Sequence, residues 1–384
     1  MHTSRTMSPH AKRKQIWEQV VPDIATKKEY LMHLLLALAG EHLLYEVHMS
    51  GSITAGINES QSALPAYDEH ELQLEYHRVI QHHQRGLEGF RQALADISPD
   101  TAEYVFCGAL LIVAIAFASI STRDQDCPGL GLGKQDDDQY PYIDWLHLVR
   151  GLTSIVQEHW LTLKLGRLRA MLFYIYANDD WKLAVPASSS AQFSRLKHAP
   201  QVFHVFVQGA TQAIRMLRAF AATLFPGTAS LDGKSISTSQ HSDNEQASEA
   251  EDHPYDYTHA IGKLEEIYMR ILYVLQFSRS ERDCAPALEI QIDIEDSAVT
   301  SWPYMISNSF FDSLKSREQL RPAEGFSYAI LAHFYVVSLL FPDVWYLNSG
   351  FRSEIEKILL LVNKLENHAL SALMAWPMAV IAGS

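Results

Sequence analysis

Residues 104–122 read YVFCGALLIVAIAFASIST and carry no charged side chain. Their number is close to the roughly 20 residues that a helix needs to cross a bilayer. The stretch is rich in Gly, Ala and Ser, however, and basic or aromatic residues do not flank both of its ends. Because the surrounding segments are amphipathic and need a common apolar partner, this stretch is predicted to be a buried central helix, not a membrane span.

The segments around this stretch have the periodicity of amphipathic helices. Between residues 68 and 94, apolar side chains recur every three or four positions and form one stripe. The same spacing occurs in residues 28–48, 142–157, 163–176, 202–224, 258–277, 326–340 and 352–370. The chain is therefore predicted to be all-α, a single multi-helix domain with long loops.

Four stretches break this pattern. Residues 49–66 and 123–141 are rich in Gly, Ser, Pro and Asp, which is typical of linkers. Residues 226–256 are rich in Ser and acidic side chains and offer little to bury, so we predict a disordered insertion there. Residues 288–294 read LEIQIDI, and this alternation predicts an extended segment that lays four apolar side chains on the helical body.

Charge and cysteine content limit the class of protein. The chain has 31 basic and 45 acidic residues, a net charge of −14, which opposes nucleic-acid binding. Its one basic cluster, Lys12-Arg13-Lys14, is interpreted as part of a solvated polar tail over residues 1–16, with a nuclear-import signal as the alternative. The three cysteines are widely separated and odd in number, which indicates a reducing compartment and excludes a zinc cluster.

Three local strings resemble binding motifs but are better explained otherwise. The glycine-rich run 129–134 lacks the spacing of a phosphate-binding loop, so we interpret it as a plain loop. His253, Asp256 and His259 could approach one metal ion, but they lie at a linker edge, where Asp256 or Thr258 is more simply a helix cap. His83 lies on the apolar stripe of its helix and His82 does not, so this pair cannot chelate one metal from one face.

An all-helical terpene cyclase is the enzyme class that the chain length allows. Such enzymes hold Mg²⁺ and a diphosphate between acidic motifs, because Mg²⁺ requires carboxylate oxygens beside the phosphates. Residues 136–138 and 178–180 are the acidic candidates. The first runs into a loop, and the second lacks the hydroxyl and acid expected further along the helix. The sequence therefore predicts no enzyme, no cofactor and no metal site.

Five segments carry a resemblance to a known family. They are His82–Leu94, Tyr142–Gly151, Phe326–Phe334, Asp343–Tyr346 and Trp376-Pro377. In order and spacing the chain resembles the carboxy-terminal regulatory domain of fungal zinc-cluster transcription factors of the sterol-uptake-control type. The resemblance runs from residue 17 to residue 384 and is to a fold and a role, because no segment is catalytic.

The resemblance implies a nuclear regulator, or one that shuttles from the cytoplasm, that senses a sterol-like apolar molecule. It extends to control of sterol or secondary-metabolite genes, and to a homodimer or a complex with another transcription regulator. Family members usually begin with a six-cysteine zinc module, and none precedes Trp17. We therefore expect no specific DNA binding by this chain, whether the module is lost or truncated. A ligand-free scaffold that acts through a partner is the alternative function.

The family's ligand pocket lies among helices and is closed by the carboxy-terminal segment. The matching side chains in this sequence would come from the central helix, from a late helix and from the closing segment. They are Phe106, Leu110, Val113 and Phe117; Ile330, Phe334, Val337 and Phe341; and Trp376, Pro377 and Met378. Ordinary core packing is the alternative role of each residue.

Overall fold

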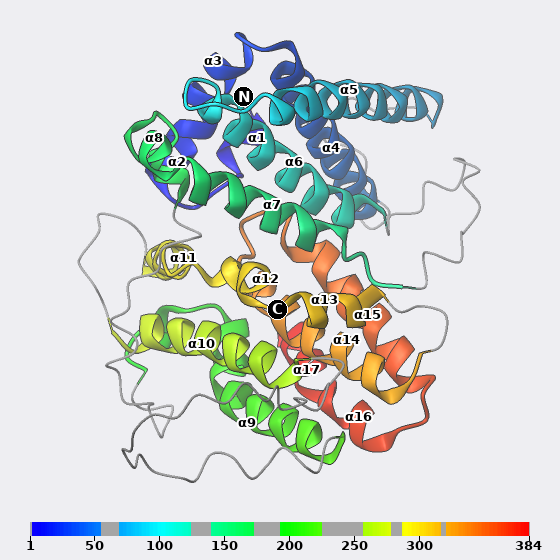
Figure 1. The fold of residues 1–384 in the computed structure, drawn as a ribbon. Helices are drawn as coiled ribbons and strands as arrows, with labels where there is room; N and C mark the ends of the chain where they lie inside the picture. The colour runs from blue at the N-terminus through cyan, green and yellow to red at the C-terminus, as the bar shows by residue number, and fades with distance from the viewer. Residues whose placement is uncertain are drawn as a thin grey trace, which may run out of the picture.

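The computed structural model describes residues 2–54, 69–123, 140–172, 193–224, 256–277, 286–315 and 320–383. Every regular element in these ranges is helical, as the sequence predicts. In Figure 1 helices α1–α8 form one end of the molecule, and helices α9–α17 form the other. The chain thus builds its two ends largely in sequence order.

The first end contains an N-terminal segment and a set of longer helices. The N-terminal segment, residues 2–25, comprises α1 (His2–Arg5), α2 (Ala11–Gln15), the π-helix η1 (Ile16–Val20) and α3 (Val21–Ala25). It is followed by α4 (Glu29–Thr54), α5 (Glu69–Ala95), α6 (Ala102–Arg123), α7 (Asp144–Glu158), α8 (Trp160–Leu165) and the 3₁₀ turn η3 (Arg169–Leu172). Helix α4 packs against both α5 and α6.

The second end contains more and shorter helices. Its elements are η6 (Leu196–His198), α9 (Gln201–Leu224), α10 (Tyr257–Gln276), α11 (Pro286–Asp296), η7 (Val299–Ser301), α12 (Trp302–Met305), α13 (Asn308–Lys315), α14 (Pro322–Tyr335), η8 (Ser338–Leu340), α15 (Asn348–Asn363), α16 (His368–Leu373) and α17 (Ala375–Gly383). Helix α14 contacts α10, α13, α15 and α16 and is buried along its length, so it is the centre of this end.

Helix α6 occupies the central position that its apolar sequence predicts. Two described stretches, Ala102–Thr122 and Pro322–Leu340, are long and apolar enough to cross a membrane, but 89% and 94% of their most apolar windows are buried inside the molecule. Such burial is the pattern of a core helix. At Gly108 a side-chain Cβ would lie 2.7 Å from Phe90 and 3.3 Å from Leu31, so the glycine allows α4 and α5 to approach α6 closely.

Two hydrophobic clusters meet at α6 and α7. The N-terminal cluster is built by the N-terminal segment, α4, most of α6 and the inner face of α7. The C-terminal cluster is built by α9–α17, the end of α6 and the first turns of α7. Helix α6 packs against α15, and α7 packs against α12. These two helices therefore belong to both clusters and join the two ends.

Residues 288–294 are not extended, as their alternation predicts, but lie within helix α11. Ile290 and Ile294, one turn apart, enter the C-terminal cluster. The intervening Gln291 and Asp293 are buried as well. Gln291 donates a hydrogen bond of 2.9 Å to Asp343, and Asp293 accepts one of 2.7 Å from Arg195. The helix is buried on polar and apolar sides alike, so a period-two pattern did not mark a strand.

Residues 2–16 are helical and partly buried, so the expected solvated tail is wrong. Met7, Ile16 and Trp17 are 2%, 6% and 6% exposed, and Arg13 is 4% exposed. Tyr346 also donates a hydrogen bond of 2.9 Å to the carbonyl of Met7. The division into a tail and a domain from residue 17 stays a prediction.

Two predicted helices are shorter in the structure. The pattern at 163–176 corresponds to α8 and η3, because Gly166 ends α8 in an extended conformation. The pattern at 352–370 corresponds to α15 and α16, which Glu366 separates with a positive φ of 52°. The predicted insertion at 226–256 lies outside the described residues except for Asp256, as do most of the other two linkers.

Candidate functional site

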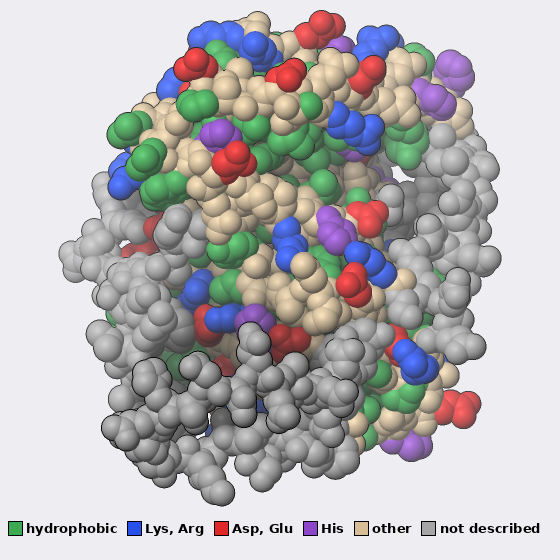
Figure 2. All heavy atoms as spheres, in the orientation of Figure 1, with side chains coloured by type: hydrophobic (Ala, Val, Ile, Leu, Met, Phe, Trp, Pro, Cys, Tyr) green, Lys and Arg blue, Asp and Glu red, His purple; other side chains and the backbone are tan. Residues whose placement is uncertain are grey.

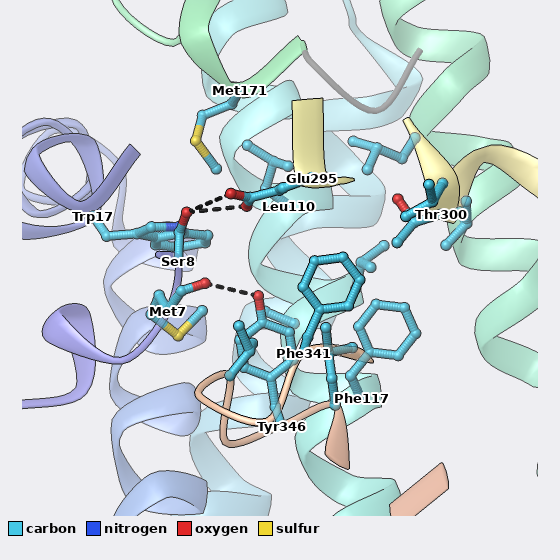
Figure 3. A pocket seen from close by; sticks show the side chains of 17 residues that line it. Met7, Ser8, Trp17, Leu110, Phe117, Met171, Glu295, Thr300, Phe341 and Tyr346 are labelled. Atoms are coloured by element: carbon cyan, nitrogen blue, oxygen red, sulfur yellow. Dashed lines mark hydrogen bonds between the residues drawn. The ribbon is translucent and has the colours of Figure 1, made fainter. Parts of the chain in front are cut away.

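An apolar cavity of about 110 Å³ lies where the N-terminal segment meets α6, α7 and η7. Figure 3 shows this cavity from close by. Its lining residues are Met7, Ser8, Trp17, Leu110, Val113, Ala114, Phe117, Val149, Leu152, Met171, Glu295, Val299, Thr300, Phe341, Val344, Tyr346 and Leu347. These residues come from both ends of the molecule, so the cavity lies at their junction.

One face of α6 forms the apolar wall. Leu110, Val113, Ala114 and Phe117 follow one another at steps of three and one, which places all four on the same side of a helix. The Phe117 ring lies parallel to the ring of Tyr346, with centroids 6.2 Å apart. The wall is therefore fixed by the helical register of the apolar stretch.

A small polar group lies at the end of the cavity nearest the N-terminal segment. The Ser8 hydroxyl donates to both carboxylate oxygens of Glu295, at 3.0 and 3.1 Å. Figure 3 shows these two bonds and the bond from Tyr346 to Met7 beside them. Burial raises the pKa of Glu295, and the neighbouring Arg13 and Ser8 act in the opposite direction. The carboxylate of Glu295, a strong hydrogen-bond acceptor, thus lies at the end of a mainly apolar cavity.

Arg13 holds the N-terminal segment to α11. Its guanidinium lies 2.7 Å from the carboxylate of Glu295, pairs with Asp296, and donates a bond of 3.3 Å to the carbonyl of Ala170. The Arg13 side chain is 5% exposed and that of Glu295 12%. Removal of one partner of such a pair leaves a buried charge without compensation. The N-terminal segment is therefore anchored over the cavity as a cover.

The cavity includes four of the eleven predicted ligand residues: Leu110, Val113, Phe117 and Phe341. Seven predicted residues lie elsewhere. Phe106 is buried in the N-terminal cluster, and Ile330, Phe334 and Val337 are buried in the C-terminal cluster. Trp376, Pro377 and Met378 lie in α17. Whether any of the eleven binds a ligand stays a prediction.

The carboxy-terminal segment packs on α9 and not on this cavity. The ring of Trp376 lies 5.6 Å from Phe206, 5.5 Å from Tyr268 and 5.6 Å from His333, measured between centroids. A Cβ at Gly209 of α9 would lie 2.1 Å from the Trp376 indole. The glycine therefore makes the space in which the indole sits.

The sequence did not identify the residues that cover the cavity. Met7, Ser8 and Trp17 close it from the N-terminal segment, and Glu295 supplies its carboxylate from α11. The available signal for these residues was the presence of two apolar side chains, Met7 in the otherwise polar tail and Trp17 beside it. The pairing of Arg13 with Glu295 spans most of the chain and leaves no local pattern.

Other clusters of titratable side chains do not form a metal site within the described residues. His33 and His82 share a hydrogen bond of 2.8 Å between ring nitrogens, and burial lowers the pKa of His82. Asp256 caps α10, as expected, by accepting a bond from the backbone of His259. His253, the glycine-rich run 129–134 and the acidic runs 136–138 and 178–180 lie outside the described residues.

Basic and acidic side chains are mixed over the described part of the face in Figure 2, where no continuous basic stripe is seen. Within the basic cluster of residues 12–14, Arg13 is buried in its ion pairs with Glu295 and Asp296. This arginine is therefore not available to bind a phosphate backbone, so the basic cluster has one positive charge fewer for nucleic-acid binding.

Comparison with known proteins gives one match. The whole chain, residues 1–384, matches the family model described as "Fungal specific transcription factor domain". No curated protein and no solved structure gives a significant match.

Proposed function

Because the chain belongs to the family of fungal specific transcription factor domains, a family of regulators and not of enzymes, we propose that it is a ligand-sensing regulatory domain. Its ligand is a small apolar molecule that binds in the cavity between α6 and the N-terminal segment. The observation that supports this proposal is an apolar cavity at the junction of the two ends, covered by a segment that polar contacts and buried apolar side chains hold in place. The family also supports a nuclear location.

The site joins parts of the molecule that a ligand could move relative to one another. Residues from the N-terminal segment, α6 and the 341–347 stretch contact the same space. A molecule bound there contacts all three, so it favours whichever arrangement of the cover it fits best. A ligand shifts an equilibrium only by its difference in affinity for two states, and a cavity under a removable cover provides such a difference.

The volume of the cavity limits the size of the ligand. An apolar cavity of about 150 Å³ in another protein binds benzene, whereas pockets for drug-sized ligands measure about 300–1,000 Å³. At about 110 Å³ the present cavity accommodates a molecule or a molecular end no larger than a single ring. The sterol that the resemblance implies would fit as a whole only after displacement of the N-terminal segment.

Thermal unfolding with a panel of apolar compounds tests this proposal. Toluene and cyclohexane are expected to raise the melting temperature, since a ligand at a hundredfold excess over its dissociation constant adds about 2.7 kcal/mol to stability. Val113→Phe, which fills the cavity, is expected to abolish the shift. Ile112→Val, on the same helix but outside the lining, is the control that should retain it.

Ergosterol and cholesterol form the second arm of the panel. A shift with a sterol that grows when the cover is loosened by Arg13→Met would support a sterol ligand. No shift with any compound, together with a regulator that co-purifies, would favour the ligand-free scaffold instead. We propose control of sterol or secondary-metabolite genes from the sequence resemblance alone. The class of ligand that binds would indicate which of the two sets of genes is controlled.

A further inference from the structure

We infer that the ligand of the cavity carries a hydroxyl group that donates a hydrogen bond to Glu295, so the ligand class is small apolar alcohols and phenols. The inference rests on the proposed function, since it describes the molecule that occupies the same cavity. It is carried by the position of one carboxylate at the end of an otherwise apolar lining.

The carboxylate of Glu295 has acceptor capacity beyond its described partners. An ionised carboxylate offers about four acceptor positions on its two oxygens. The described donors are the Ser8 hydroxyl, shared between both oxygens, and Arg13, which lies 2.7 Å from Oε2. From the described part of the chain, oxygen Oε1 therefore receives only the shared bond from Ser8, at 3.0 Å. A further donor in the cavity would complete its hydrogen bonding.

The neighbouring polar groups favour a donor over an acceptor in the ligand. The Ser8 hydroxyl uses its proton on Glu295 and accepts a bond of 3.1 Å from the backbone N–H of His10. A ligand carbonyl or ether would face the carboxylate with lone pairs opposed to lone pairs. Figure 3 shows the Thr300 side chain on the far side of the cavity, where a hydroxyl can also serve as acceptor.

The apolar walls determine the polarity and size of the ligand apart from its hydroxyl group. Leu110, Val113 and Phe117 line the cavity from α6, and Figure 3 shows Phe341 beside Phe117. The volume of about 110 Å³ is smaller than the roughly 150 Å³ of a cavity that binds benzene, so a single ring with one hydroxyl, such as phenol or cyclohexanol, is the upper limit of ligand size.

Paired probes with and without a hydroxyl test the inference. A dry apolar cavity favours toluene over phenol, because the phenol hydroxyl loses its water and gains nothing in return. With Glu295 as acceptor, phenol is expected to bind the wild-type chain at least as tightly as toluene, and cyclohexanol at least as tightly as methylcyclohexane. Titration calorimetry on the full chain measures the four dissociation constants.

Two variants locate the effect at the carboxylate. Glu295→Gln keeps the shape of the side chain and removes its charge, so the ratio of phenol affinity to toluene affinity should fall about tenfold or more. Ser8→Ala removes the competing donor without disturbing the ion pair to Arg13. It should raise the ratio of phenol affinity to toluene affinity several-fold.

The outcomes separate this inference from the proposed function. Toluene binding with phenol excluded would overturn the hydroxyl inference and leave the apolar cavity as the site. Phenol binding that neither variant alters would also overturn it, since the hydroxyl would then lie elsewhere. Failure of all four probes to bind would overturn both proposals.

Discussion

Replacement of Gly209 by alanine tests how the carboxy-terminal segment is seated. The new Cβ would lie 2.1 Å from two atoms of the Trp376 indole, well inside van der Waals contact. The partly buried ring contacts Phe206, Tyr268 and His333, so it can move away from Gly209 only by losing some of these contacts. Overpacking costs about 1–3 kcal/mol, and the three aromatic contacts that the indole would disturb by moving place this site near the upper value. Alanine regains about 1 kcal/mol of helix propensity, so we expect a net destabilisation of about 2 kcal/mol.

Urea unfolding followed by far-ultraviolet circular dichroism measures this change. Gly262→Ala in α10 is the matched control, because no atom lies within 4 Å of the position that its Cβ would take. The control is expected to stabilise the chain by about 0.5–1 kcal/mol through propensity alone. The two alanine variants should therefore shift the midpoint in opposite directions.

A stabilising effect of Gly209→Ala equal to that of Gly262→Ala would refute the reasoning. The indole would then not be seated on α9, and α17 would be free to cover a ligand pocket as the sequence resemblance implies. Trp376→Phe in the Gly209→Ala background gives a second check. A smaller ring should recover part of the lost stability, since the two residues are in contact and their effects are coupled.

Three further predictions concern the core, pH and DNA. Gly108→Leu should destabilise the chain by about 1–3 kcal/mol, because Phe90 and Leu31 occupy the space around it, and unchanged melting would contradict the central position of α6. Burial lowers the pKa of His333 to about 4, below the value of about 6.5 in the unfolded chain. As pH falls, the unfolded state therefore takes up the proton first, and about 3 kcal/mol of stability is lost between pH 6.5 and 4. His333→Gln should reduce this loss. Unfolding measured across that pH range checks the prediction. The purified chain should give no discrete footprint on DNA at physiological salt, because its net charge is −14 and Arg13 is used internally.

The sequence predicted the fold well where one physical rule decides the outcome. The charge-free stretch at 104–122 could only be a core helix or a membrane span, and its composition favoured the core. The amphipathic stripe at 68–94 corresponds to α5 within one residue at each end. The rule failed at 288–294, because Gln291 and Asp293 look exposed by pattern but are buried with partners that lie far away in sequence.

The cavity was harder to predict than the helices. Leu110, Val113, Phe117 and Phe341 were named from the sequence resemblance and line the cavity, and their role in ligand binding stays a prediction. The cover was not predicted, because its contacts depend on a charge pair between Arg13 and Glu295 that no local pattern marks. The resemblance pointed to the carboxy-terminal segment as the closing element, whereas the structure packs Trp376 against α9. Contacts between distant segments were thus the part that periodicity could not supply.

The order of synthesis separates the cover in time from the residues with which it forms hydrogen bonds. Ser8 meets its partner Glu295 across 287 residues, and Met7 meets Tyr346 across 339. At about 5–20 residues per second, a ribosome needs roughly 15 to 60 s to supply the first of these partners. During that interval Met7 and Trp17 can pack against the N-terminal cluster that they share with α4 and α6, but the polar contacts to Glu295 and Tyr346 cannot form. The hydrogen bonds and ion pairs that fix the cover over the cavity are therefore completed well after the cover itself and its apolar neighbours have been made.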